Sequence, residues 1–342
     1  MIIALNQDRK YILATEANKQ QQFLCPGCQE RVILRSGEIN QKHFAHQNNS
    51  NCATFSENET AQHLSGKLQL ASKLQPYGEI VIEAVLPEIN QRPDILIKRK
   101  EKYIAIEYQC SPISQKRLDE RNAGYKSQNI HVVWLLGQNY FVKNMTQKTI
   151  FKFLAQNSIR FYLPDIGKFV YRTNFVKYDF ERVRYTEKYS EQLSHPKQIA
   201  QIVTTNTQKQ IYKLQHLVFQ KRVDEKLVRY LYESGRLLLT APVWIHQGNT
   251  FGLLIPNWHW RLLMVLMIEH VGVGHVVHQQ YIIMKLTQYL RGDVAFKYEQ
   301  IALIIFDLEQ RNIIFKKGQY ILVRQLLTWY PSLQEKLGKV RK

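Results

Sequence analysis

The feature that most constrains the fold is a pair of apolar runs in residues 91–111, QRPDILIKRKEKYIAIEYQCS, on either side of the charged stretch 98–102. The two runs have the character of strands, and the polar stretch between them suits a hairpin. In such a hairpin Asp94, at the start of the first strand, lies beside Glu107, near the end of the second. Side chains two residues apart share one face of a strand, so Glu107 and Gln109 project together. The sequence therefore predicts two carboxylates and an amide at one end of a hairpin.

This arrangement predicts a metal site. Two neighbouring carboxylates repel one another unless a cation lies between them. All-oxygen sites suit Mg²⁺ or Mn²⁺, which activates water and neutralises the charge of a phosphate transition state. Asp94 and Glu107 are the predicted ligands, and Gln109 is predicted to orient the water or the metal through its carbonyl oxygen. The pattern favours metal-dependent phosphodiester chemistry.

A helix is predicted just upstream, in residues 57–75. Glu59, His63 and Lys67 recur every four residues and so lie along one helical face. A β-rich run with Glu83 follows, and then the two strands of the hairpin. A further helix and the apolar run 130–137, typical of a strand buried on both faces, complete the order αβββαβ. The predicted class is therefore α/β.

Two motifs resemble those of the PD-(D/E)xK nuclease superfamily. Pro93-Asp94 matches the first element and Glu107-Tyr108-Gln109 the second, with glutamine where most members carry lysine. The resemblance implies a restriction-endonuclease-like core in which a lysine places positive charge near the scissile phosphate, and Lys67 is the candidate replacement. The residues assigned to catalysis on this basis are Asp94, Glu107, Gln109, Lys67, His63, Glu59 and Glu83.

The helix after the hairpin is predicted to begin at an N-cap Ser111, with Pro112 in its first turn, and to run to about residue 126. Arg117, Arg121 and Tyr125 are spaced by four and form one basic, aromatic stripe. Such a stripe either contacts the phosphate backbone of DNA or pairs with nearby acids.

A second constellation lies upstream. Cys25-Pro26-Gly27-Cys28 is followed by fourteen residues and then by His43-Phe44-Ala45-His46. Cys25, Cys28, His43 and His46 are the predicted ligands of a structural zinc ion, with Cys52 as an alternative to one histidine. The other interpretation is a reduced dithiol beside two surface histidines. A segment this short cannot bury a stable core, so a metal would contribute to folding.

Together these motifs resemble the competence protein CoiA family over roughly residues 1–150. The resemblance implies a role in natural transformation of Gram-positive bacteria, in which incoming DNA is processed or recombined by a protein with a nuclease-like central domain. Its implied partners are DNA, as single strands or recombination intermediates, and recombination proteins.

The net charge of the chain is consistent with a nucleic-acid partner. The net charge is +19; residues 1–150 hold 19 Lys and Arg against 14 Asp and Glu, and residues 151–342 hold 28 against 14. Such an excess favours a polyanion, and anionic membrane is the competing one. No apolar run approaches the length of a spanning helix, the N-terminus lacks a signal-peptide core, and four cysteines suit a reducing compartment, so a cytoplasmic location is expected.

Four segments are predicted along the chain. They are an N-terminal β-rich zinc-binding region, 1–56; a nuclease-like domain, 57–150; a β-containing connector, 151–195; and a basic, mostly α-helical C-terminal domain, 196–342.

Two classes of function follow from these patterns. The first is a metal-dependent deoxyribonuclease, which the intact acidic pair favours. The second is a DNA-binding recombination accessory, which the glutamine at position 109 favours.

Overall fold

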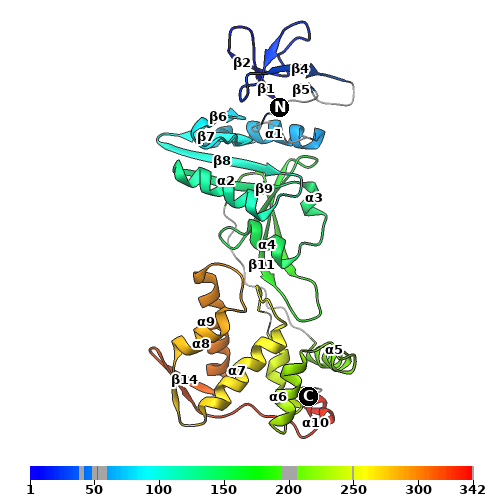
Figure 1. Ribbon diagram of the computed structural model, residues 1–342, viewed down its shortest axis with the longest axis vertical. Coiled ribbons are helices and arrows are strands. Elements are labelled where there is room, and N and C mark those ends of the chain that lie inside the picture. The colour runs from blue at the N-terminus through cyan, green and yellow to red at the C-terminus, as the bar shows by residue number, and fades with distance from the viewer. Residues whose placement is uncertain (38–41, 48–51, 53–59, 195–205, 249, 341–342) are drawn as a thin grey trace. The chain divides into compact units, whose positions relative to one another are not determined.

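A computed structural model describes all residues of the chain except 38–41, 48–51, 53–59, 195–205, 249 and 341–342 (Figure 1). The chain forms two compact units. The first contains Met1–Met145, Lys152–Thr173 and Thr186–Gln198, and the second contains Thr146–Phe151, Asn174–Tyr185 and Ile199–Lys342.

The first unit begins with a five-stranded antiparallel sheet of order β2-β1-β3-β4-β5. Its strands are β1 (Ile3–Leu5), β2 (Tyr11–Leu13), β3 (Phe23–Leu24), β4 (Arg31–Arg35) and β5 (His43–His46). The core beneath them is small, with Phe23, Phe44 and Met1 as its largest buried side chains. So few apolar groups give this sheet little stability of its own.

The predicted αβββαβ order is present in the same unit. Its elements are α1 (Ala61–Leu74), β6 (Glu79–Ile82), β7 (Ile95–Arg99), β8 (Lys102–Gln109), α2 (Gln115–Ser127) and β9 (Ile130–Leu136). Strands β7 and β8 form the expected antiparallel hairpin, in which Ile95 pairs with Ile106. This register places Asp94 and Glu107 at the same end of the hairpin.

Helix α2 begins later than the sequence predicted. Its N-cap is Ser114, whose hydroxyl accepts a hydrogen bond from the Arg117 N–H at 3.1 Å, so the prediction of Ser111 as the cap was wrong. The Ser111 carbonyl oxygen instead accepts hydrogen bonds from the side chains of Gln109 and Tyr140. Both serines precede the helix; Ser114 caps it, whereas the Ser111 carbonyl oxygen is held by a local contact and by one from Tyr140, 29 residues away. Strand β9 then lies parallel to β8.

The segment predicted to be a connector contributes strands to the central sheet. These are β10 (Ile159–Leu163), β11 (Lys168–Val176) and β12 (Arg184–Ser190), which follow the short helices α3 (Gln138–Phe141) and α4 (Gln147–Phe153). They extend the sheet to seven strands in the order β12-β11-β10-β9-β8-β7-β6. All five residues of β10 are buried, so its Arg160-Phe161-Tyr162 belongs to a sheet interior, whereas β12 at the sheet edge is largely exposed.

The second unit is mostly helical. Its helices of regular length are α5 (Thr207–Phe219), α6 (Glu225–Glu233), α7 (Asn257–Val271), α8 (Gln279–Thr287), α9 (Val294–Gln310) and α10 (Leu333–Val340). A three-stranded sheet that the sequence did not predict joins them, with β13 (Val276–His278), β15 (Tyr320–Val323) and β14 (Ile314–Lys317) in that order.

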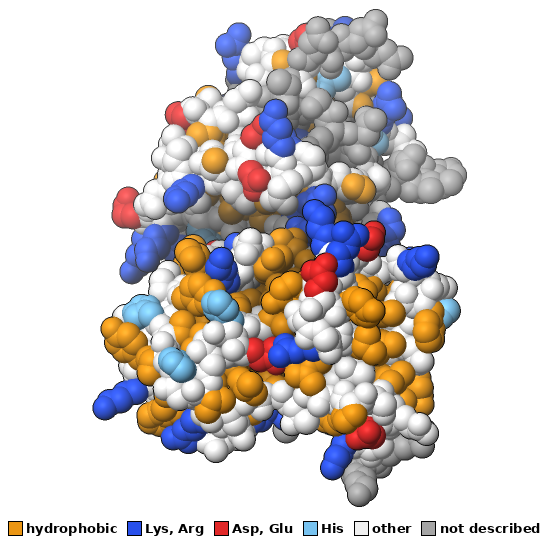
Figure 2. Space-filling view, turned by 60° about the horizontal axis from the view of Figure 1, so that its bottom comes forward, with side chains coloured by type: hydrophobic (Ala, Val, Ile, Leu, Met, Phe, Trp, Pro, Cys, Tyr) orange, Lys and Arg blue, Asp and Glu red, His pale blue; other side chains and the backbone are white. Residues whose placement is uncertain are grey.

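Apolar side chains of this unit fill a core around the fully buried Trp260 and also reach the surface, as Figure 2 shows. On α9, Val294, Leu303 and Phe306 are more than half exposed. Among the helices that the structure describes, none is both long and apolar enough to cross a lipid bilayer.

Candidate functional site

Asp94 lies where β7 begins, opposite the first turns of α1. Helix α1 starts after Thr60, whose hydroxyl accepts a hydrogen bond from the His63 N–H. Because His63 and Lys67 are one turn apart, both reach Asp94: the His63 Nε2 lies 3.3 Å from Oδ2 and the Lys67 Nζ lies 3.0 Å from Oδ1. The Tyr108 N–H of β8 donates to Oδ2 at 2.9 Å. The predicted meeting of helix and hairpin at Asp94 is therefore present.

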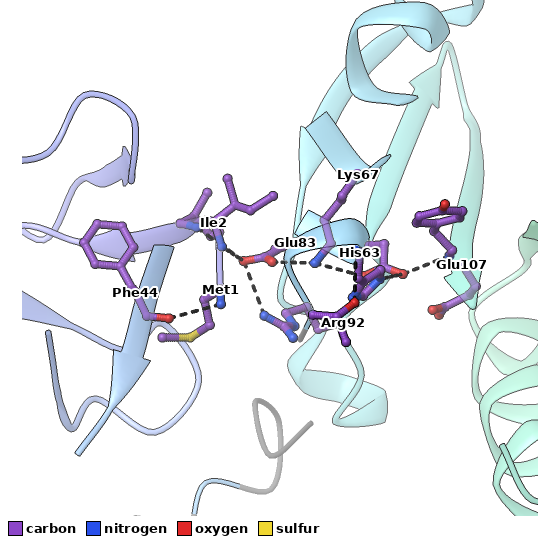
Figure 3. A network of polar contacts seen from close by, with 12 residues as sticks. Met1, Ile2, Phe44, His63, Lys67, Glu83, Arg92 and Glu107 are labelled. Atoms are coloured by element: carbon purple, nitrogen blue, oxygen red, sulfur yellow. Dashed lines mark hydrogen bonds and ion pairs between the residues drawn. The ribbon is translucent and has the colours of Figure 1, made fainter. Parts of the chain in front are cut away.

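The Lys67 ammonium also binds a second carboxylate, that of Glu83. Its Nζ lies 2.6 Å from Glu83 Oε1, and the Lys67 and Glu83 side chains are both fully buried. We call Asp94, His63, Lys67 and Glu83 the Asp94 centre. Figure 3 shows Glu83 between Lys67 and the N-terminal sheet.

The pKa of Asp94 reflects these neighbours. Burial acts to raise it, but the Lys67 ammonium and the His63 ring outweigh burial and hold the pKa well below its usual value of 3.8. Asp94 is therefore ionised at neutral pH and retains small solvent exposure, 13% of its side chain. It is a carboxylate that a cationic group can approach.

Glu107 is held by a separate set of groups on α2. The Arg121 guanidinium donates to Glu107 Oε1 from Nε at 3.1 Å and also from Nη2, and the Tyr125 hydroxyl donates to the same oxygen. Burial raises the pKa of Glu107 against the opposing charge of Arg121, and the negative charge of Asp94 raises it further. In Figure 3 no contact is drawn from the Glu107 carboxylate to the side chains of the Asp94 centre.

Of the two alternatives for the α2 stripe, these contacts agree with pairing to nearby acids and not with an open DNA-contacting surface. Tyr125 is fully buried and only 12% of the Arg121 side chain is exposed, so neither lies on an open surface. Arg117 is the exposed member, and its guanidinium lies 3.6 Å from Glu120. Leu118 is buried beside them, and its spacing of three and seven residues from Arg121 and Tyr125 is the signal that this helical face points inward.

The side chain of Gln109 makes its hydrogen bond outside the Asp94 centre. Gln109 donates from Nε2 to the Ser111 carbonyl oxygen at 2.7 Å. Glu59, the first residue of the predicted helical face, lies outside the residues that the structure describes.

A divalent cation fits this region in part. Asp94 and Glu107 offer the oxygen donors that Mg²⁺ or Mn²⁺ prefers. Each is already paired with a protein cation, Asp94 with Lys67 and Glu107 with Arg121. Within the described residues, the N-terminal cysteines and one histidine are the one group of three or more potential ligands close enough to share an ion. A metal between Asp94 and Glu107 therefore requires one of these ion pairs to open.

The N-terminal group, which we call the cysteine cluster, consists of Cys25, Cys28, His46 and Cys52. Their ligand atoms all lie within 4.8 Å of one another. Cys25 Sγ is 3.8 Å from Cys52 Sγ, and Cys28 Sγ is 3.3 Å from His46 Nε2. Three thiols and one imidazole are a typical donor set for structural zinc, and this group could hold such an ion.

The cluster differs from the predicted ligand set at one position. His43 and His46 are three residues apart on β5, so their side chains point to opposite faces of the strand. His46 belongs to the cluster and His43 does not; the fourth position is taken by Cys52, the alternative ligand. All four cysteines of the chain are free thiols.

Burial favours the protonated thiols of Cys25 and Cys28 in the absence of metal. It raises the pKa of Cys25 to about 12 and that of Cys28 above its usual value of 9.0. Because a metal binds the thiolate, binding displaces these protons.

Comparison with known proteins agrees with this architecture. The family model described as "Competence protein CoiA, nuclease-like domain" matches residues 59–230, and that described as "Competence protein CoiA, N-terminal domain" matches residues 5–55. "Competence protein CoiA" of Bacillus subtilis (strain 168) is 35% identical over 131 residues, which cover 37% of this chain. The match spans 35% of that relative's length. No solved structure matches the chain.

Proposed function

This chain belongs to the competence protein CoiA family, and on that premise we propose that its nuclease-like domain hydrolyses phosphodiester bonds of incoming DNA during natural transformation and recombination. The reaction takes place in the reducing cytoplasm, where the four free thiols persist.

One observation carries the proposal: the buried Lys67 ammonium lies 3.0 Å from Asp94. The neutral Gln109 offers no charge to a scissile phosphate. Lys67 supplies a permanent cation at the same carboxylate from a different element, helix α1. The positive charge that phosphoryl chemistry needs near the reacting group is thereby retained.

The remaining roles follow from position. Asp94 and Glu107 would hold Mg²⁺ or Mn²⁺, which when bound activates water and stabilises the charge of the phosphate. Lys67 orients the phosphate, and His63, with 15% of its side chain exposed beside Asp94, accepts or returns the proton of the attacking water. Glu107 becomes available when Arg121 moves to the phosphate.

Zinc in the cysteine cluster has a structural role in this proposal. The N-terminal sheet has a small core, and a zinc ion held by Cys25, Cys28, His46 and Cys52 would tie the turn after β3 to β5 and to Cys52. The excess of Lys and Arg in residues 151–342 binds the DNA backbone, which makes affinity fall steeply with salt. Single strands or recombination intermediates are the proposed substrates, with recombination proteins as partners.

The test is cleavage of labelled single-stranded, duplex and branched DNA by the purified protein with Mg²⁺, Mn²⁺ or EDTA. We expect metal-dependent cleavage that Asp94→Asn and Lys67→Met each reduce by at least ~100-fold, as for loss of one group that stabilises transition-state charge. Glu79→Gln, an exposed acid on β6, is the matched control and should cleave normally. Cleavage that survives Asp94→Asn would overturn the assignment of the site.

A second function is favoured by the contacts of Glu107. A carboxylate held by Arg121 and Tyr125 is not free to bind metal, which suits a DNA-binding recombination accessory that no longer cleaves. In that case the same assay should give tight, salt-sensitive binding without cleavage of any substrate, and Asp94→Asn should bind as well as the native protein.

A further inference from the structure

Glu83 has an unusual backbone as well as buried contacts. It follows β6 with φ of 53°, a left-handed conformation that is uncommon for residues other than glycine. Among the described non-glycine residues with positive φ, Glu83 alone is buried. Its N–H donates to the Asp94 carbonyl oxygen at 3.0 Å. Backbone strain at a buried acid suggests that the position of its carboxylate matters.

The two oxygens of this carboxylate face different parts of the unit. Oε1 accepts from Lys67, one of the groups at Asp94. Oε2 accepts from the Ile2 N–H at 2.9 Å and the Ile3 N–H at 3.3 Å, both in the N-terminal sheet, and lies 3.3 Å from Arg92 Nη1. Glu83 therefore joins the N-terminal sheet to the Asp94 centre (Figure 3).

The contacts continue from Ile2 to the cysteine cluster. The Phe44 N–H of β5 donates to the Met1 carbonyl oxygen at 2.9 Å, next to Ile2. Phe44 is two residues from His46, and side chains at this spacing share one face of β5. A short, continuous set of backbone and side-chain contacts thus runs from a cluster ligand to Lys67.

We propose that Glu83 is a positioning residue through which the folded N-terminal sheet holds Lys67 against Asp94. When Ile2 and Ile3 donate to Oε2, Glu83 shares its charge between two sets of partners, and Lys67 remains between Glu83 and Asp94. When those N–H groups are withdrawn, Glu83 loses its anchor on the N-terminal sheet and moves together with Lys67 toward solvent. The cysteine cluster then regulates the site at a distance, because it keeps the N-terminal sheet folded.

This inference rests on the proposed function only for its effect on cleavage; the positioning of Lys67 is testable without it. The probe is the rate at which an amine-acylating reagent modifies Lys67, followed by mass spectrometry of the α1 peptide. Native Lys67 is fully buried and should react slowly. Ile2→Pro removes the shorter N–H bond, and we expect modification to rise about tenfold, the effect of losing one hydrogen bond to a charged group.

Glu83→Gln is the second variant, because it leaves the hydrogen bonds within the N-terminal sheet in place. It too should expose Lys67, and Ile2→Pro added to it should have little further effect, since both changes break the same connection. Gln7→Pro, at an exposed turn of the N-terminal sheet, and Glu79→Gln, on β6, are the matched controls and should leave Lys67 protected. Chelation of the metal should also increase modification of Lys67.

Cleavage gives a readout that general loosening of the fold would not produce. Ile2→Pro should lower kcat in the native protein but should not further lower the residual cleavage of Lys67→Met, because both changes remove the same cation from Asp94. Unchanged Lys67 protection in Ile2→Pro, or additive effects in the double variant, overturns the inference even if DNA is cleaved. If Lys67 protection responds as expected but no DNA is cleaved, the inference stands and the proposed hydrolysis fails.

Discussion

The cysteine cluster and the Asp94 centre lie in one compact unit, but they differ in where their balancing charge comes from. The cluster brings together three thiols and an imidazole, all of which can donate electrons to a metal. The Asp94 centre and neighbouring Glu107 combine carboxylates with the protein's own cations, Lys67 and Arg121. A cluster of donors alone favours an external ion, whereas carboxylates with internal partners are satisfied without one. Four predictions follow from this difference.

The largest effect is expected at the cysteine cluster. Cys52→Ala removes a ligand of the proposed zinc ion, which would contribute on the order of 10 kcal/mol to folding of this module, so zinc should be lost and the N-terminal sheet should unfold. Zinc content per chain and hydrogen exchange in β4 measure both effects. His43→Ala, on the opposite face of β5 from His46, is the control. Equal zinc loss in the two variants would contradict the assigned ligand set.

The loss of folding free energy in Lys67→Met should be smaller than that in Cys52→Ala, but it should still be large. It leaves Glu83 and Asp94 buried together without their shared cation, and breaking a buried ion pair costs ~3–5 kcal/mol. The free energy of local opening, measured by hydrogen exchange in β8, should fall by this amount. Lys73→Met, at a partly exposed position on the same helix, should change it by less than about 0.5 kcal/mol. If Lys67→Met changes the free energy of opening as little as Lys73→Met does, the Lys67 charge is not required for the stability of this region.

Arg121→Met tests whether Glu107 takes up an external metal ion once it has lost its internal cation. Tyr125 still donates to Glu107, so we expect a smaller loss, about 2 kcal/mol, in the absence of divalent ions. Mn²⁺ or Mg²⁺ should restore part of it, because the freed carboxylate gains a cation. Thermal unfolding with and without metal measures the effect, with the exposed Arg117→Met as control. If neither Mn²⁺ nor Mg²⁺ changes the thermal unfolding of Arg121→Met, the result contradicts a metal at Glu107.

The smallest effect, counted per pH unit, is expected in the second unit, where a buried lysine lacks a balancing acid among its described contacts. The Lys336 ammonium lies 3.1 Å from the Leu239 carbonyl oxygen and 2.9 Å from His246 Nε2. Burial lowers the pKa of Lys336 from 10.5 to about 7. The unfolded chain therefore binds more protons than the folded one between about pH 7 and pH 10, and stability should rise across this range by about 1 kcal/mol per pH unit.

Urea unfolding at several pH values, with hydrogen exchange in α10 as the probe, measures this slope. Lys336→Met should remove it, while Lys339→Met, at an exposed position on the same helix, should retain it. Stability that falls as pH rises through this window would contradict the assignment.

Several features of the site were predictable because they depend on local spacing. The hairpin register followed from two apolar runs and a polar turn, and it correctly placed Asp94 at the same end as Glu107. The four-residue spacing of His63 and Lys67 predicted their shared face, and both reach Asp94. The spacing of Cys25 and Cys28 likewise predicted a shared cluster. Periods of two and four residues are properties of the strand and the helix themselves.

Other features were decided by tertiary packing. Spacing placed Arg121 and Tyr125 on one face of α2, but packing of α2 against the sheet turned that face toward Glu107. Cys52 entered the cluster, and residues 151–195 supplied strands of the central sheet, through pairing between distant segments.

The sequence by itself thus determined which chemical groups this protein carries and which neighbours along the chain share a face. Only the tertiary structure decided how the charges are balanced. The bonds from Ile2 and Ile3 to Glu83 join residues about eighty positions apart, and no local period specifies such a contact. A buried charge is costly unless it is paired or hydrogen-bonded. The buried carboxylates Glu83, Asp94 and Glu107 are therefore stable only where packing brings donors or cations to them, from whichever part of the chain these come.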